Sequence, residues 1–151
     1  MPTANSSAQP VAEFNISAIP NGREGIARLI VTAFAAAGFG RPQQLAALAN
    51  AIAESNLNPG VVSVPPEQAI GLFQISRAGG LGAGHTIAEL EDPTINVTIV
   101  LSAVRKVDDF AKATSLEDAV NIFVNRIERP SNPASEVGRR LKIAELLAQT
   151  K

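Results

Sequence analysis

One carboxylate at the end of an apolar stretch is the residue of this sequence best placed for acid catalysis. Residues 46–53 hold a single polar side chain, and Glu54 follows them directly, before the polar segment 55–59. Burial raises the pKa of a carboxylic acid, and the partial negative charge at a helix C-terminus raises it further. A carboxyl group still protonated near neutral pH can act as a general acid. Glu54 is therefore a candidate proton donor, and the alternative is a solvated charge at a helix end.

The residue inventory argues against other kinds of chemistry. The chain of 151 residues has one histidine, His85, and no cysteine. It has no G-x-S-x-G motif and no phosphate-binding glycine pattern, so nucleophilic triads, metal sites and nucleotide cofactors are not expected. The formal net charge is −1, with no run of Lys or Arg, which disfavours nucleic acid as a partner. We interpret His85 as a structural or solvated loop residue.

Two further carboxylates are compared with Glu54 as possible acids. Glu67 follows two prolines in a loop-rich region and is a possible second acid, or else a solvated loop charge. Glu128 follows a predicted helix and precedes Arg129, which is typical of an ion-paired structural residue. Carboxylate chemistry of this kind points to glycoside cleavage, which needs a proton donor to the leaving oxygen.

The helices that must position these residues can be predicted from periodicity and capping signals. Apolar residues at helical spacing predict a helix over about 24–37, and a second helix starts near Pro42 and ends at Glu54. Side chains that can cap a helix open three later segments: Thr86 a short helix, Asp92 a helix to about Lys112, and Ser115 a helix that ends at Pro130. The last helix is predicted from Asn132 and Pro133 onward.

The second helix is apolar or small on all sides, which is typical of a buried central helix. Residues 56–85 are rich in Pro and Gly and form a loop-rich lobe, with short strands possible at 61–64 and 69–75. The sum predicts a mainly α fold, a compact bundle of five or six helices around a central helix with this lobe beside it. We expect one domain over 21–151 and a flexible N-terminal arm over 1–20.

Several short motifs occur in an order that resembles the lytic transglycosylase and goose-type lysozyme group. These are a Glu-Ser opening, a serine, a Gly-Leu-Phe-Gln segment and an Asp-Pro-x-x-Asn helix start, found at 54–59, Ser63, 69–75 and 92–96. The segment 123–130, which contains Glu-Arg-Pro, and an arginine in the last helix (Arg139 or Arg140) look more like the phage tail lysozyme branch. The resemblance covers about residues 24–150.

This resemblance implies a lysozyme-like fold and a function for the site. Glu54 would be the acid, and then the base, that cleaves the β-1,4 bond between N-acetylmuramic acid and N-acetylglucosamine in peptidoglycan. The residues implied in substrate binding are Ser63, Glu67, Gly71, Phe73, Gln74 and Asn125. One acid is enough in a lytic transglycosylase, because the muramoyl 6-hydroxyl attacks internally, whereas a muramidase uses water. The sequence leaves both routes open.

The place of action is also an expectation from the sequence. The first ten residues have neither a basic nor an apolar signal segment, and the longest apolar run, 26–39, is too short to span a bilayer. We expect a virion component on a phage tail or baseplate that acts on the bacterial cell wall and contacts other tail proteins through its N-terminal arm. An endolysin is an alternative. The rival from another class is a structural tail protein that keeps the fold with weak or no activity.

Overall fold

The computed structural model describes residues 8–63, 68–78 and 80–149. In this part the chain is mainly helical, which confirms the predicted fold class. None of the described helices has the length and apolar content needed to cross a membrane. In chain order, the helices are the 3-10 helix Ile16–Ala18, α1 Glu24–Ala36, α2 Arg41–Ser55, α3 Ile87–Glu91, α4 Pro93–Val104, α5 Asp108–Lys112, α6 Leu116–Ile122, the π-helix Phe123–Glu128 and α7 Pro133–Ala148.

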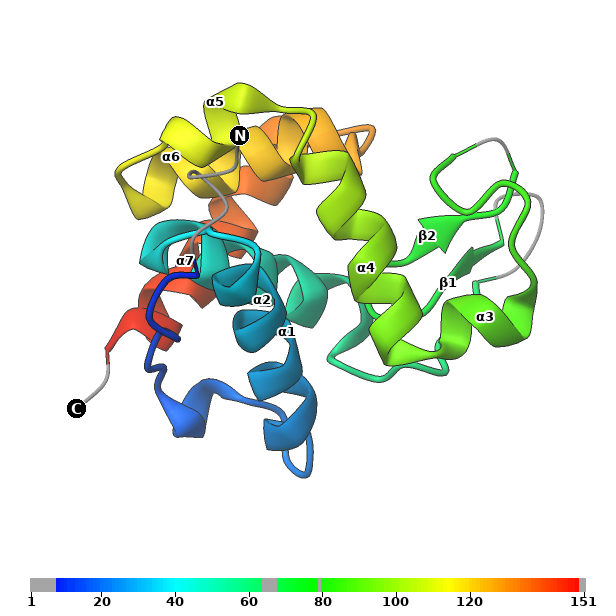
Figure 1. Ribbon diagram of the computed structural model, residues 1–151, viewed down its shortest axis with the longest axis horizontal. Helices are drawn as coiled ribbons and strands as arrows, with labels where there is room; N and C mark the ends of the chain where they lie inside the picture. Colours follow the sequence, from blue (N-terminus) through cyan, green and yellow to red (C-terminus); the bar gives the residue numbers. More distant parts are fainter. Residues whose placement is uncertain (1–7, 64–67, 79, 150–151) are drawn as a thin grey trace.

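Helix α2 is the centre of the bundle. It is in contact with α1, α6, α7 and the π-helix, and the whole run 43–51 is buried. Leu45 and Leu48 are fully buried, as expected for a helix surrounded by other helices. Figure 1 shows α2 behind α1, with α7 and α6 on its other sides. The C-terminus of α2 points toward the smaller lobe, so the end of the central helix lies where the two parts of the molecule meet (Figure 1).

The lobe contains a very short sheet. Strands β1 (Ala69–Ile70) and β2 (Ile75–Ser76) are antiparallel, with Ala69 opposite Ser76 and Ile70 opposite Ile75. Val62 adds an isolated bridge to Ile70. The predicted strand 69–75 is therefore wrong in its middle, because residues 71–74 form the turn that joins β1 to β2. Part of the predicted strand 61–64 lies outside the described residues. Helix α3 lies against this lobe, and α4 runs from it back to the bundle (Figure 1).

The predicted helix starts at Thr86, Asp92 and Ser115 are confirmed. The Thr86 hydroxyl accepts a hydrogen bond from the Glu89 backbone N–H, and the Glu89 carboxylate accepts one from the Thr86 N–H. Asp92 accepts from the N–H groups of Thr94 and Ile95. Each capping side chain satisfies donors that the helix cannot pair internally, and such a local interaction is visible in sequence.

The prediction of a single helix from Asp92 to Lys112 is wrong, because the helix ends after Val104. Val107 leaves the helical region, with φ −113° and ψ 92°, and α5 begins at Asp108. The break allows Phe110 to be fully buried, with its ring 5.4 Å from Phe39 and 5.7 Å from Phe123. Gln43 of α2 then donates hydrogen bonds to the carbonyls of Phe110 and Ala113, at 2.8 and 2.7 Å. Long-range packing thus decides this boundary.

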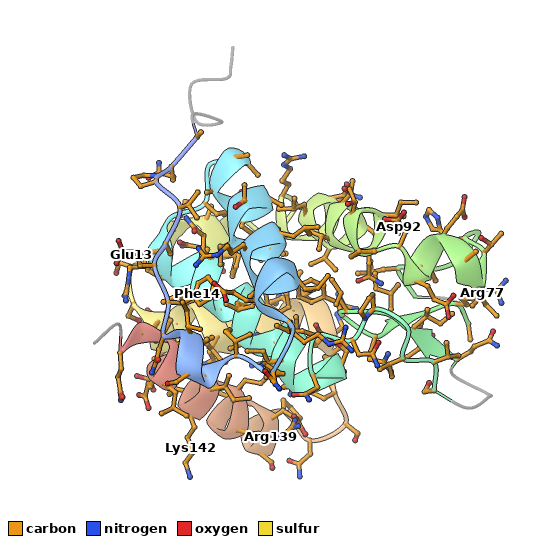
Figure 2. The ribbon with its side chains drawn as sticks, turned by 90° about the horizontal axis from the view of Figure 1, so that it is seen from below. Glu13, Phe14, Arg77, Asp92, Arg139 and Lys142 are labelled. Atoms are coloured by element: carbon orange, nitrogen blue, oxygen red, sulfur yellow. The ribbon has the colours of Figure 1, made fainter. Side chains whose placement is uncertain are left out.

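Residues 8–20 lie against the helices. The Gln44 amide accepts a hydrogen bond from Ala12 N at 2.7 Å and donates one to Pro10 O at 2.9 Å. Phe14 is buried, and Asn15 N donates to Leu147 O at 2.8 Å. Figure 2 shows Phe14 on this segment where it runs beside the helices. Residues 1–7, the rest of the predicted flexible arm, lie outside the described part of the chain.

Candidate active site

Glu54 lies in the last turn of α2, at the junction of the bundle and the lobe. The helix ends because Asn56 takes the left-handed conformation, with φ 55°. The next residue after Glu54, Ser55, donates a hydrogen bond from its hydroxyl to Leu72 O at 2.8 Å. This bond ties the end of α2 to the β1–β2 turn. The Glu54 side chain is 21% exposed, so it is largely removed from water and still reachable.

Arg140 of α7 holds the Glu54 carboxylate. Its side chain is only 3% exposed, and its Nη2 atom lies 2.6 Å from Glu54 Oε2. The Nη1 atom of Arg140 donates to Glu136 Oε1, one turn earlier on α7. The neighbouring Arg139, labelled on α7 in Figure 2, donates to Ala53 O at 3.2 Å. Charge-assisted hydrogen bonds therefore fix the end of α2 on α7.

Glu128 completes the group. It is the last residue of the π-helix, which closes with a hydrogen bond of 2.7 Å from Arg129 N to Val124 O, and Arg129 has φ 51°. The carboxyl groups of Glu54 and Glu128 lie close enough together that each shifts the pKa of the other. The Oε2 atom of Glu128 is buried and has no hydrogen-bond partner among the described residues.

The predicted structural ion pair of Glu128 is therefore wrong for the part of the chain that the structure describes. Neither Arg129 nor any other described cation forms a salt bridge with it, and the charge that most affects its pKa is that of Glu54. The wider turn of the π-helix decides which way the Glu128 side chain points, because it changes the angular position of the side chains relative to an α-helix. The Glu-Arg-Pro motif was the only sequence signal for Glu128, and it did not indicate where the side chain lies.

The electrostatics of the pair follow from burial and from the neighbouring charges. Burial raises the pKa of Glu54 above its ordinary value, although the Arg140 charge and the neighbouring Glu128 carboxyl group oppose the shift. Burial, followed by the negative charge of Glu54, raises the pKa of Glu128 well above its ordinary value. Two carboxyl groups in one poorly hydrated place cannot both ionise readily. Each of the two carboxyl groups is therefore harder to ionise than an ordinary glutamate.

A cavity of about 650 Å³ opens beside Glu128, between the lobe, the C-terminal end of α4 and the π-helix. Phe73 and Gln74 of the β1–β2 turn line it on one side, and Glu128 lines it on the other. Three cationic residues also line this cavity, namely Lys106, Arg126 and Arg129. The cavity has the size of a small-ligand site and a positively charged wall, and Glu128, but not Glu54, is one of its lining residues.

Two of the residues predicted to bind substrate share this cavity. Gln74 has φ 49°, an uncommon value for a residue other than glycine, and its amide donates to Val61 O and Gly71 O, both at 3.1 Å. These bonds leave its side-chain oxygen as an acceptor on the cavity wall. Phe73 is 1% exposed, and its ring packs 5.9 Å from the ring of Phe123. Phe73 thus forms the floor of the cavity more than a stacking surface.

Gly71 is placed by packing inside the lobe. Its φ is 84°, and a Cβ atom at this position would lie 2.4 Å from both Asn96 Nδ2 and Leu90 O. Asn96 is fully buried, donates to Ile70 O and Leu90 O, and accepts from Phe73 N at 3.1 Å. This asparagine of α4 therefore fixes the turn that carries Phe73 and Gln74. Nothing in the sequence beyond the Asp-Pro-x-x-Asn motif pointed to it.

The remaining predicted residues lie elsewhere or outside the described part. The Ser63 hydroxyl accepts a hydrogen bond from Ala69 N at 2.7 Å and so closes the loop before β1. Asn125 is exposed, and its amide donates to Asn121 on the preceding turn. Glu67 lies outside the described residues. The binding roles of these residues stay predictions.

Comparison with known proteins matches residues 25–150 to the family described as phage tail lysozyme. Among curated proteins, no sequence matches the chain. The matched range begins within α1 and includes Glu54, Glu128 and Arg140.

Proposed function

The chain belongs to the phage tail lysozyme family, and we propose that it is a peptidoglycan glycosidase in which Glu54 is the acid and then the base. The bond cleaved is the β-1,4 bond between N-acetylmuramic acid and N-acetylglucosamine. The observation that carries this proposal is the Glu54 carboxyl group, 21% exposed and held by Arg140 where the bundle meets the lobe, next to Glu128 on the wall of the cavity.

The reaction needs a single proton in its first step. Protonated Glu54 gives its proton to the glycosidic oxygen, the bond from this oxygen to C1 of the muramoyl residue breaks, and its electron pair stays on the oxygen. The positive charge that develops at C1 lies near the carboxylates, which stabilise it. The attacking hydroxyl then bonds to C1 and returns its proton to Glu54.

The spacing of the two carboxyl groups favours an internal nucleophile. Inverting glycosidases place their carboxyl groups roughly 6.5–9.5 Å apart and retaining ones roughly 5–5.5 Å apart. Glu54 and Glu128 lie close enough together to shift each other's pKa, which favours a single acid–base unit on one side of the bond. We infer a lytic transglycosylase route, in which the muramoyl 6-hydroxyl attacks C1 and a 1,6-anhydro product forms.

The charge of the cavity wall supports an anionic glycan as the substrate. Lys106 follows α4, and Arg126 and Arg129 come from the π-helix and its end. Peptidoglycan carries carboxylates on its peptide stems, and a cationic wall attracts them. Arg126 is also paired at 3.7 Å with Asp109, and since both side chains are exposed, this pair is weak enough to open.

We propose further that the protein acts as part of a virion. The segment 8–20 exposes two large apolar side chains, with Val11 48% and Ile16 52% exposed. Such residues at one surface can contact other tail or baseplate proteins. A structural tail protein without activity is the second candidate, because such a surface would serve assembly in a protein with no enzymatic role as well.

A zymogram on purified peptidoglycan tests the proposal. The parent protein should clear the substrate, Glu54→Gln should not, and Glu145→Gln, an exposed change on α7, should behave like the parent. Circular dichroism spectra of all three should agree. Absence of clearing by the folded parent would favour the structural candidate, and clearing by Glu54→Gln would remove Glu54 from the mechanism. Mass analysis for 1,6-anhydro ends decides between transglycosylase and muramidase.

A further inference from the structure

The wall of the cavity of about 650 Å³ holds three cations that pair with none of its described carboxylates. These are Lys106, Arg126 and Arg129. In the part of the chain that the structure describes, neither Lys106 nor Arg129 forms a salt bridge, and Arg126 is 3.7 Å from Asp109 in an exposed pair. Glu128 lies on the same wall and forms a salt bridge with none of the three. Since the whole chain has a formal net charge of −1, this local excess of cations favours an anionic ligand.

The cavity lies beside the candidate acid and does not contain it. Glu128 is one of its lining residues, and Glu54 is not. The Ser55 hydroxyl, one residue after Glu54, donates to Leu72 O at 2.8 Å, and the next residue, Phe73, lines the cavity. The group that fills the cavity is therefore a neighbour of the cleaved bond and not the bond itself.

The peptide stem of peptidoglycan is such a neighbour. The stem is attached through a lactyl group to C3 of the muramoyl ring, and the cleaved bond is at C1 of the same ring. The stem therefore starts close to the acid and extends away from it. The second residue of the stem, D-glutamate, carries the first carboxylate along the stem from the sugar.

We propose that this cavity is a subsite for the peptide stem, in which Lys106 and Arg129 bind the D-glutamate carboxylate. This inference rests on the proposed function and deepens it, because it names the substrate as glycan that carries anionic peptide stems. The two cations determine specificity and take no part in the transfer of the catalytic proton.

The rest of the wall suits the other groups of a stem. Phe73 and Val100 line it, and Leu81 is 43% exposed there, so the methyl groups of the lactyl and alanyl units can pack on an apolar surface. The side-chain nitrogen of Gln74 is already used in two hydrogen bonds to carbonyls of the lobe, so its oxygen can accept from a peptide N–H of the stem. These apolar, acceptor and cationic parts together match a short anionic peptide better than an uncharged sugar.

A ligand without a glycosidic bond tests the subsite separately from catalysis. N-acetylmuramoyl-L-alanyl-D-glutamate carries the lactyl group and the stem carboxylate, and the proposed reaction cannot cleave it. In an NMR titration of the full chain at low salt, we expect backbone amide shifts at Lys106 and Arg129. The diamide of this ligand, which has no carboxylate, should bind about tenfold more weakly, since a hydrogen bond to a charged group contributes about this much or more. Equal affinity for the two ligands, or shifts only outside the cavity, would overturn the inference.

The double variant Lys106→Gln/Arg129→Gln tests the two cations. Both side chains are exposed, so the fold should tolerate the changes. We expect the affinity for the anionic ligand to fall about tenfold, to near the affinity for the diamide. Arg105→Gln/Lys112→Gln is the matched control, since it removes two exposed charges that do not line the cavity. Equal losses in the two double variants would indicate a general effect of net charge and would overturn the subsite.

Cleavage assays separate this inference from the proposed function. With the parent protein, peptidoglycan whose stem carboxylates have been converted to amides should show kcat/KM about tenfold lower than untreated peptidoglycan, mainly through KM. Equal kcat/KM on the two substrates would overturn the subsite and leave the glycosidase function intact. A parent protein that binds the anionic ligand as expected but cleaves neither substrate would overturn the proposed function and leave the anion-binding cavity.

Discussion

Arg140 places its Nη2 atom 2.6 Å from Glu54 Oε2, although the two residues lie 86 positions apart in the sequence. Its other terminal nitrogen, Nη1, donates to Glu136, so one buried guanidinium group binds two carboxylates. This contact joins the central helix to the last helix at the candidate site, and its removal should affect both stability and activity.

Replacing Arg140 by methionine should destabilise the fold by about 3–5 kcal/mol, because the variant removes a buried cation and leaves two partly buried carboxylates without it. Urea unfolding at neutral pH measures the loss. Arg139→Met is the matched control, since Arg139 is 55% exposed and its loss should cost about 1 kcal/mol or less. Equal losses in the two variants would contradict the importance of the Arg140 contact. Arg140→Lys should recover only part of the stability, because an ammonium group lacks the fork.

The stability of the protein should fall as the pH rises above about 4.5, the ordinary pKa of glutamate. The pKa of Glu128 in the folded state is raised, so the folded state binds more protons than the unfolded state above that pH. The contribution of Glu128 is fully present below the unfolded pKa and is lost as the pH rises through the folded pKa. Denaturant unfolding measured at a series of pH values gives the slope. The slope should become smaller in Glu128→Gln and should not change in Glu145→Gln.

Alanine at Gly71 and at Gly138 should have opposite effects. Gly71 has φ 84° and its missing Cβ would lie 2.4 Å from Asn96 and Leu90, so Gly71→Ala should cost about 2 kcal/mol or more. Gly138 lies inside α7 with no atom within 4 Å of an added Cβ, so Gly138→Ala should stabilise by about 0.5–1 kcal/mol. Thermal unfolding compares the two. A stable Gly71→Ala protein would contradict the packing of Asn96 against this turn.

Phe14→Ala should lower the free energy of unfolding by about 3 kcal/mol, since Phe14 is 8% exposed and packs with the core. Ile16→Ala on the same segment should cost less than about 1 kcal/mol, because Ile16 is 52% exposed. Chemical denaturation of both variants decides whether residues 8–20 belong to the cooperative fold. Similar small losses in both would mean that this segment detaches without affecting the helices.

Gln74→Gly should reduce activity much more than stability. Glycine relieves the positive φ of 49°, which offsets part of the lost hydrogen bonds to Val61 and Gly71. Gln68→Gly is a close control: Gln68 has φ 48°, lies in the same lobe and is absent from the cavity wall. We expect kcat/KM on peptidoglycan to fall about tenfold or more in Gln74→Gly and to stay near the parent value in Gln68→Gly. Equal activities would remove Gln74 from the substrate site.

The fold could be predicted from the sequence where local interactions decide it. The caps at Thr86, Asp92 and Ser115 and the apolar central helix each depend on residues within one or two turns, so short patterns contain them. The break at Val107 could not be predicted in this way, because it depends on burial of Phe110 and on hydrogen bonds from Gln43 across the core.

The same distinction between local and long-range interactions applies to the candidate site. Sequence alone identified Glu54 as the acid candidate and, by resemblance, the phage tail lysozyme family, because an apolar helix that ends in a carboxylate is a local pattern. Only the tertiary structure brought Glu128 and Arg140 to that carboxylate, from a π-helix and a last helix far along the chain. Helical periodicity tells which face of an element is apolar, but it does not tell which residue meets it across the core. The pKa of Glu54 depends on these contacts across the core, because burial, the Arg140 cation and the Glu128 carboxyl group all act on it.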